Sequence, residues 1–214
     1  MDEIRLRELR RDYSSRELSE ETIDADPFKQ FSAWMAEALN SQIIDANAMT
    51  IATVDAQNRP SSRVVLLKGF DTDGFVFFTN YESKKAADLA GNRSIALHFF
   101  WPQLERQVMI NGAAQKTPRE ESEEYFATRP LESRIGAWAS NQSHVLESRA
   151  ELVKKIAEVR ARFEGKDVPC PPFWGGYRVT PDRFEFWQGR ESRLHDRIVY
   201  ILSEGSWRTA RLSP

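Results

Sequence analysis

Three cationic or titratable side chains alternate along one short stretch, FEFWQGRESRLHDR, which runs from Phe184 to Arg197. If this stretch is a strand, Arg193, His195 and Arg197 point to one face, because side chains along a strand alternate with a period of two. Such groups repel one another unless an anion, a carboxylate or open water faces them. The pattern therefore indicates either an anion-binding face or a solvated, charged edge strand.

Cationic residues also flank an apolar segment, predicted to be a strand, earlier in the chain. Arg63 and Lys68 flank the aliphatic residues of SRVVLLKGF, and their odd spacing places them on opposite faces of a regular strand. Each could instead mark a strand end that reaches water. Lys84 and Lys85 begin a predicted helix, SKKAADLAGN, where two lysines are tolerable if an anion binds the free N–H groups. The alternative is an exposed helix start.

Further hydrogen-bond donors gather near a predicted kink in YFATRPLESR, namely Tyr125, Arg129, Ser133 and Arg134. The sequence ASNQS adds Gln142 and Ser143, which alone would suit an ordinary loop. Taken together, these arginines, lysines and hydroxyls indicate that more than one phosphate is bound.

Other chemistries find less support. The histidines, His98, His144 and His195, are far apart, and no Cys/His spacing resembles a zinc site, so we expect no metal. Cys170 lies between prolines without a local base, which does not favour a nucleophile. The chain has no G-x-S-x-G, Walker or G-x-G-x-x-G motif.

The composition suits a soluble globular protein. The 214 residues are 41% hydrophobic and 29% charged, and the net charge of −2 gives no basic field for nucleic acid or anionic lipid. The single cysteine fits a reducing compartment. No apolar run reaches the length of a membrane span, and the N-terminus lacks the core of a signal peptide. These features predict a cytoplasmic protein that binds neither nucleic acid nor membrane.

We expect a charged, mobile arm over residues 1–25 and one domain over 26–214. A helix should begin with Asp26 as N-cap and Pro27 in its first turn. Its predicted apolar face comprises Phe28, Phe31, Trp34, Met35, Ala38 and Leu39. Short strands follow in AMTIATVD, SSRVVLLKGF, GFVFFTN, SIALHFFW and ERQVMINGAAQ, with a hairpin turn at Asp73-Gly74.

A helical insertion is predicted over about residues 117–165. Thr117-Pro118-Arg119-Glu120 matches a capping box, and a second helix spans roughly 148–164 with Gly165 as its stop. Four further strands are predicted in YRVTP, RFEFWQG, RIVYILS and SWRTARL. The strand spacing favours an antiparallel barrel or sandwich.

Seven ordered segments resemble the pyridoxine (pyridoxamine) 5′-phosphate oxidase family. They are LRRDY, SRVVLLKGF, FFTNYESKKA, LERQVMINGAA, YFATRPLESRIGAWASNQS, PPFWGGYRV and FEFWQGRESRLHDR, and the resemblance continues to RLSP at the end of the chain. It implies a mainly β protein with α-helices, an FMN-binding split β-barrel with peripheral helices. It also implies a homodimer with FMN at the subunit interface and both chains lining each site. One face of the Arg63–Lys68 strand would then serve its own barrel and the other the interface.

The resemblance also implies site residues. FMN would contact Arg63, Val64, Val65, Leu66, Leu67, Lys68, Phe78, Thr79, Lys84, Lys85, Gln107, Gln142, Ser143, Trp187 and Arg197. The substrate phosphate would be held by Lys68, Tyr125, Arg129 and Ser133. Arg193 and His195, the catalytic pair, would lie against the pyridine ring, and Arg10 and Tyr13 would close over the substrate. Lys84 departs from the arginine expected in many relatives, which implies a looser phosphate contact.

The implied reaction oxidises pyridoxine 5′-phosphate or pyridoxamine 5′-phosphate to pyridoxal 5′-phosphate. A hydride would pass from C4′ to the flavin, dioxygen would reoxidise the flavin to give hydrogen peroxide, and the amine substrate would release ammonia. One alternative is a related flavoenzyme that acts on another aromatic ring, such as a phenazine precursor. A second is a protein that binds flavin or pyridoxal phosphate without catalysis. A third is a nucleic-acid-binding barrel, which the acidic pI disfavours.

Overall fold

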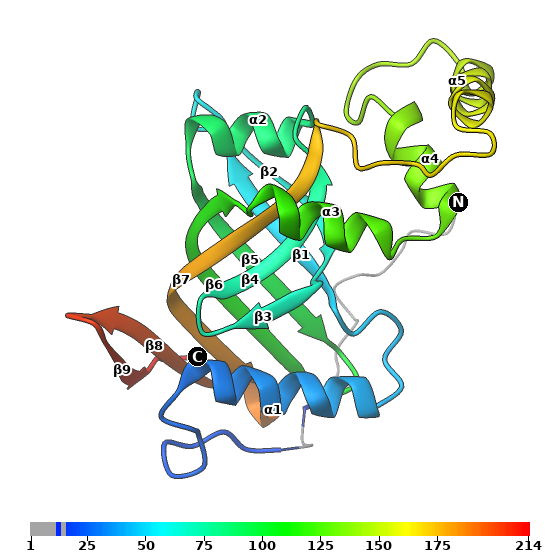
Figure 1. Cartoon of the computed structure of the whole chain (residues 1–214). Coiled ribbons are helices and arrows are strands. Elements are labelled where there is room, and N and C mark those ends of the chain that lie inside the picture. The colour runs from blue at the N-terminus through cyan, green and yellow to red at the C-terminus, as the bar shows by residue number, and fades with distance from the viewer. Residues whose placement is uncertain (1–11, 14–15) are drawn as a thin grey trace, which may run out of the picture. The chain divides into compact units, whose positions relative to one another are not determined.

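A computed structural model of the chain describes residues 12, 13 and 16–214 (Figure 1). Within this range the chain forms a nine-stranded sheet and several α-helices, which confirms the predicted class, mainly β with α. The hydrogen-bonded order is β2-β1-β5-β6-β7-β4-β3, with β8 paired to β7 and β9 to β8. No helix in the described range has both the length and the apolar character needed to cross a bilayer.

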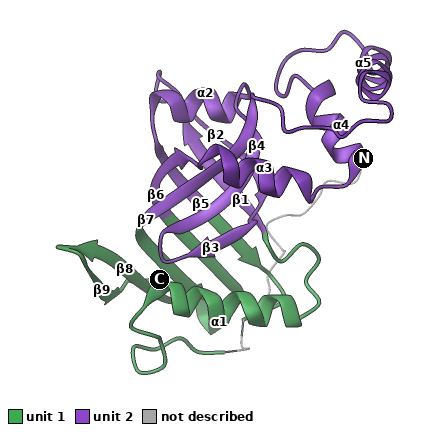
Figure 2. Ribbon diagram, viewed as in Figure 1, with its two compact units in different colours: residues 1–47, 98–110, 182–214 green, residues 48–97, 111–181 purple. Residues whose placement is uncertain are grey.

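The elements follow one another in this order: α1 (Pro27–Asn40), β1 (Ala48–Val54), β2 (Pro60–Leu66), β3 (Gly69–Asp71), β4 (Gly74–Asn80), α2 (Lys84–Gly91), β5 (Ser94–Trp101), β6 (Arg106–Lys116), α3 (Arg119–Ala127), α4 (Leu131–Ala139), α5 (Arg149–Arg162), β7 (Trp174–Gln188), a 3-10 turn (Glu191–Arg193), β8 (Asp196–Ser203) and β9 (Ser206–Arg211). The chain divides into two compact units (Figure 2). The first comprises the described part of residues 1–47 with 98–110 and 182–214, and the second comprises 48–97 and 111–181.

Helix α1 of the first unit begins where the sequence predicts. The side chain of Asp26 accepts a hydrogen bond of 2.8 Å from the Phe28 N–H, and Pro27 occupies the first turn. The predicted apolar face is wrong at its end, because Leu39 is 61% exposed. The helix instead buries Gln30, whose Oε1 accepts a bond of 3.0 Å from the Asp24 N–H.

Aromatic side chains fill the core of the first unit. Phe31 of α1 lies 5.1 Å from Phe99, and Trp34 meets Phe186 edge-on at 5.2 Å, measured between ring centroids. The Tyr200 ring is buried, and its hydroxyl donates to the Asp24 carbonyl at 2.7 Å. Contacts of this kind join α1 and the preceding segment to the strands.

Two hairpins organise the second unit. Strands β1 and β2 pair antiparallel, with Thr53 opposite Ser61, and alternate residues of β1 are buried. Strands β3 and β4 pair across the predicted turn, with Asp71 opposite Gly74. Helix α2 packs on β1 and buries Leu89.

Two strand predictions are corrected. Strand β2 ends at Leu66, so Lys68 lies on the link to β3 and the two-faced strand carrying Arg63 and Lys68 does not form. The stretches YRVTP and RFEFWQG belong to one strand, β7. Pro181 lies between the part of β7 that pairs with β4 and the part that pairs with β8, so its missing N–H breaks neither of these two ladders.

Helix α3 also begins differently from the prediction. Pro118 is its N-cap and makes no capping bond, so the capping box does not form. The Thr117 hydroxyl instead bonds the buried Ser122 hydroxyl at 3.0 Å. Helix α5 lies close to its predicted range, and the Ser148 hydroxyl caps it by accepting from the Glu151 N–H.

Gly74 carries a specific backbone requirement. Its φ is +134°, and an added Cβ would lie 2.1 Å from the Val179 carbonyl oxygen. Gly74→Ala should therefore lower the free energy of unfolding by about 2–4 kcal/mol. Gly69→Ala, at the other end of the β3–β4 pair with nothing within 4 Å of the added Cβ, is the matched control and should cost at most about 1 kcal/mol. Equal unfolding midpoints in denaturant for both variants would refute this account.

Candidate functional site

A pocket of about 1100 Å³ opens in the second unit. Strands β2, β4 and β7, the start of α2, and helices α3 and α4 supply its lining. Among the described residues that line it, the charged side chains are Arg63, Lys68, Lys84, Lys85 and Arg129, with no carboxylate. A pocket with this lining suits an anionic ligand.

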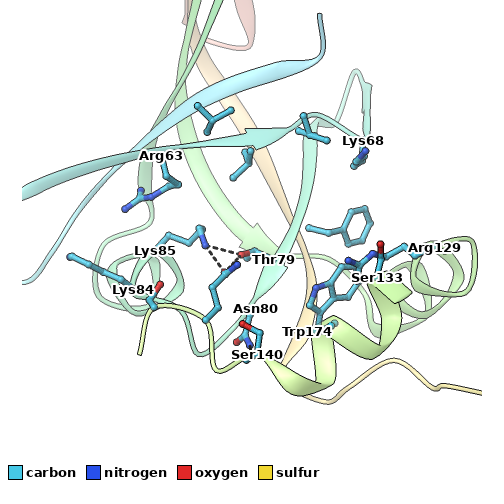
Figure 3. Close-up of a pocket in the computed structure, with 18 of the residues that line it drawn as sticks. Arg63, Lys68, Thr79, Asn80, Lys84, Lys85, Arg129, Ser133, Ser140 and Trp174 are labelled. Atoms are coloured by element: carbon cyan, nitrogen blue, oxygen red, sulfur yellow. Dashed lines mark hydrogen bonds between the residues drawn. The ribbon is translucent and has the colours of Figure 1, made fainter. Parts of the chain in front are cut away.

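The cations gather at two ends of the pocket (Figure 3). Arg63, Lys84 and Lys85 lie at one end with Thr79, whereas Lys68, Arg129 and Ser133 lie at the other end with Trp174. The two groups of cations lie on opposite sides of the view. This arrangement agrees with the inference that more than one phosphate is bound.

Lys85 is the most enclosed cation at the first end, with 7% of its surface exposed. Its Nζ donates to Thr79 Oγ1 at 3.0 Å, to Ser83 Oγ at 3.2 Å and to Gln142 Oε1 at 2.8 Å. Burial lowers the pKa of Lys85 to about 8, and the nearby charge of Arg63 adds to the shift. An anion here would restore the charged ammonium.

Arg63 and Lys84 share a buried carboxylate, Asp88, that lies outside the pocket lining. Lys84 Nζ donates to Asp88 Oδ1 at 3.0 Å, and Arg63 Nη2 lies 3.9 Å from Asp88 Oδ2. Sequence reasoning missed Asp88, although its place four residues after Lys84 on a predicted helix was a usable signal.

An aromatic stack supports the second end of the pocket. The rings of Phe78 and Tyr125 are 4.1 Å apart and nearly parallel, and Phe78 also stacks on Trp174 at 5.4 Å. The Arg129 guanidinium lies over the Trp174 ring, 4.7 Å from its centroid. Arg129 Nη1 is buried and has no hydrogen-bond partner among the residues that the structure describes. Burial lowers the pKa of Arg129. An orphaned buried donor beside a cavity is where an acceptor such as a phosphate oxygen would bind.

The structure brings most of the predicted site residues together in this pocket. From the predicted cofactor and phosphate sets it contains Arg63, Val64, Val65, Leu66, Lys68, Phe78, Thr79, Lys84, Lys85, Tyr125, Arg129, Ser133, Gln142 and Ser143. Leu67 is instead buried in the core, with 6% of its surface exposed.

The remaining predicted cofactor contacts belong to the first unit. Gln107, Trp187 and Arg197 line a cavity of about 270 Å³ there, with His98 and Glu185. Gln107 Oε1 and His98 Nε2 share a hydrogen bond of 2.9 Å. Arg197 Nε and Nη2 donate to Glu185 Oε1 at 2.8 and 2.7 Å, so this arginine is already paired with a buried carboxylate.

The predicted strand face carrying Arg193, His195 and Arg197 is wrong. Strand β7 ends at Gln188, Arg193 closes the 3-10 turn, and β8 begins at Asp196, so of the three only Arg197 is on a strand. Ser192 and Arg193 have φ values of 55° and 62°, a left-handed conformation that is uncommon outside glycine. The separate prediction of a strand RFEFWQG, which ends at Gly189, agrees with this break.

His195 is fixed by its own loop. Its Nδ1 accepts a hydrogen bond of 3.1 Å from the Arg190 N–H, so a neutral ring carries its proton on Nε2. The ring lies 4.6 Å from the Trp187 ring and 5.6 Å from the Tyr13 ring. Burial lowers the pKa of His195, and the charge of Arg193 adds to the effect. Arg10, predicted beside Tyr13, lies outside the described residues.

The described residues contain no group of three or more His, Cys, Asp or Glu side chains that could hold a metal ion. The donors of the pocket are ammonium, guanidinium, hydroxyl and amide groups, which suit phosphate rather than a cation.

Lys85 should titrate with a midpoint near pH 8 in the absence of anions. Inorganic phosphate should raise that midpoint, because only the protonated ammonium attracts the anion. NMR of protein with ¹³C-labelled lysine, assigned with a Lys85→Arg variant, measures both values, and sodium chloride at matched ionic strength is the control. A midpoint that phosphate leaves unmoved would show that Lys85 does not face the anion.

His195 should titrate below its ordinary pKa of 6.5, with the proton of the neutral ring on Nε2. The unfolded chain then binds a proton at higher pH than the folded protein does. This group therefore lowers stability as the pH falls through 6.5. Arg193→Met should raise the pKa only in part, because burial remains. Imidazole ¹⁵N NMR reports the midpoint and tautomer, and a wild-type midpoint at or above 6.5 would contradict the assignment.

Comparisons with known proteins bear on the whole chain. Residues 35–163 match the family model described as pyridoxamine 5′-phosphate oxidase, and residues 174–214 match the pyridoxine 5′-phosphate oxidase C-terminal dimerisation region. A pyridoxine/pyridoxamine 5′-phosphate oxidase from Rubrobacter xylanophilus is 54% identical, over 96% of this chain and 95% of its own length. One from Burkholderia thailandensis is 55% identical, over 98% of this chain and 99% of its own length.

Two solved structures share the fold. PhzG from Burkholderia lata, solved with tetrahydrophenazine-1-carboxylic acid, has a TM-score of 0.87 at 29% identity and covers 94% of this chain and 100% of its own. A pyridoxamine 5′-phosphate oxidase-related, FMN-binding protein from Nostoc punctiforme has a TM-score of 0.70 at 15% identity, over 90% of this chain and 100% of its own. The predicted split-barrel class is confirmed. With the family models and the relatives, these findings show that the chain belongs to the pyridoxine/pyridoxamine 5′-phosphate oxidase family.

Proposed function

We propose that this protein oxidises pyridoxine 5′-phosphate or pyridoxamine 5′-phosphate to pyridoxal 5′-phosphate with FMN as its cofactor. Dioxygen is the electron acceptor and yields hydrogen peroxide, and the amine substrate also releases ammonia. The observation that carries the proposal is one pocket with cations at two separate ends and no carboxylate among its described lining. Two phosphate monoesters, one of the cofactor and one of the substrate, match this arrangement.

The cofactor end comprises Arg63, Lys84 and Lys85 with the polar groups of Thr79 and Gln142. These residues would hold the FMN phosphate, and the β2 segment Val64–Leu66 would lie along the flavin. Bound FMN would supply the two-electron acceptor that the side chains of this protein lack. No dinucleotide fingerprint is present in the sequence, which favours FMN over FAD.

The substrate end comprises Lys68, Tyr125, Arg129 and Ser133. Arg129 would donate its unpaired Nη1 to the substrate phosphate, while Trp174 keeps the guanidinium plane in place. Binding energy from this remote phosphate would align the reacting carbon. His195 in its neutral form would donate from Nε2 to the substrate, and Arg193 would supply positive charge beside it.

A homodimer with FMN at the subunit interface would combine residues of both protomers in each site. The C-terminal match to a dimerisation region supports this proposal. Exposed apolar residues of the edge strand β2 support it as well. In a single chain, 65% of the surface of Val64 and 38% of the surface of Leu66 are exposed to solvent. Gln107, Trp187 and Arg197 would complete the cofactor site.

The similarity to PhzG favours a second candidate, oxidation of an unphosphorylated tricyclic substrate. The two candidates differ at Arg129, because a ligand without phosphate leaves its Nη1 unpaired. An oxygen electrode distinguishes them. The protein loaded with FMN should consume dioxygen with pyridoxine 5′-phosphate and far less with pyridoxine. Equal rates with both, or no oxygen uptake with either B6 phosphate, would overturn the proposal.

Arg129→Ala should raise KM for pyridoxine 5′-phosphate by about 10- to 150-fold, because a hydrogen bond to a charged group contributes about 1.5–3 kcal/mol. The measurement is steady-state oxygen uptake. Arg160→Ala is the matched control, because Arg160 forms an exposed ion pair with Glu132 and does not line the pocket. A KM for Arg129→Ala equal to that of the control would contradict the assigned role.

A further inference from the structure

Asp88 is a charged residue that the proposed reaction leaves without a role. It lies on α2, its side chain is only 4% exposed, and it is absent from the residues that line the pocket. Its Oδ2 accepts hydrogen bonds from Thr53 Oγ1 at 2.7 Å and Ser61 Oγ at 3.1 Å, and its Oδ1 accepts from Lys84 Nζ at 3.0 Å. A buried carboxylate with three donors stays ionised.

The two hydroxyls connect Asp88 to Arg63. Arg63 Nη1 donates to Thr53 Oγ1 at 2.8 Å, and Arg63 Nη2 donates to Ser61 Oγ at 2.7 Å. Each hydroxyl therefore accepts from the guanidinium and donates its own proton to the carboxylate. Thr53 and Ser61 face each other on the paired strands β1 and β2, so the sheet register fixes their spacing.

Arg63 depends on this arrangement for its direction. Burial lowers the pKa of Arg63, and the charge of Asp88 opposes that shift. The direct contact between the two groups is long, 3.9 Å, so the hydroxyls carry the shorter contacts. The three cations at this end outnumber the single carboxylate, which leaves a net positive charge for a phosphate dianion.

We propose that Asp88 is a positioning residue which, through the hydroxyls of Thr53 and Ser61, holds Arg63 and Lys84 at the phosphate end of the flavin site. This inference rests on the proposed function, because it takes FMN as the ligand of that end. A carboxylate placed behind the cations orients two of them before the ligand arrives. Asp88 would thus favour FMN over riboflavin, which has the same ring system and no phosphate.

The test compares FMN and riboflavin binding to the apoprotein by quenching of flavin fluorescence. Asp88→Asn should weaken FMN binding about 10- to 100-fold and leave riboflavin binding unchanged, because only the phosphate contacts are lost. Thr53→Val, which keeps every charge, should weaken FMN binding about tenfold in the same selective way. Asp71→Asn is the control, since Asp71 pairs with Arg178 outside the pocket.

The outcomes separate the two proposals. Unchanged FMN affinity in Asp88→Asn, or an equal loss of FMN and riboflavin, would overturn the positioning role and leave the proposed function intact. A wild-type protein that binds FMN no more tightly than riboflavin would overturn both. If Asp88→Asn does not fold, the FMN and riboflavin affinities of Thr53→Val and Ser61→Ala test the same role. Normal preference for FMN over riboflavin in both variants would refute the inference.

Discussion

Concentrated positive charge in one pocket is the constraint on which the rest of the site depends. The whole chain carries a net charge of −2, yet five cationic side chains line this pocket and no carboxylate does so within the described lining. Holding such groups together out of water is unfavourable unless donors and counter-charges are placed around them. Asp88 supplies such a counter-charge behind Arg63 and Lys84, and Lys85 relies on neutral acceptors and a lowered pKa.

The fold meets this constraint by placing the ligand contacts on paired strands and stacked rings. The register of β1 and β2 sets Thr53 opposite Ser61, and the end of β4 brings Thr79 to the Lys85 ammonium. At the other end, the Trp174 ring of β7 stacks on Tyr125 of helix α3. The Arg129 guanidinium lies over the face of the same Trp174 ring. The ligand contacts therefore lie on elements whose positions are fixed by strand pairing and ring packing, which favours a preorganised site.

Much of the fold could be predicted from the sequence, because local signals and structure agree. Asp26 caps α1, and the Asp73-Gly74 turn joins β3 to β4. Predictions failed where a residue's role depends on partners distant in sequence. The sequence predicts separate strands in YRVTP and RFEFWQG, although both belong to β7 and Pro181 lies between its two pairing segments. The gathering of pocket residues from several elements followed from family resemblance. The spacing of Asp88 from Lys84 was a local signal, but its contacts with Thr53 and Ser61 depend on strand pairing distant in the sequence.

The ionisation state of a bound phosphate tests the central claim most directly. A phosphate monoester in water has a second pKa of about 6. Contact with Arg63, Lys84 and Lys85 would favour the dianion and lower that value. A ³¹P NMR titration of the protein with bound FMN should show a dianion signal that does not move as the pH falls from about 8 to about 5.5. A bound phosphate that titrates near pH 6, as the free cofactor does, would contradict the account.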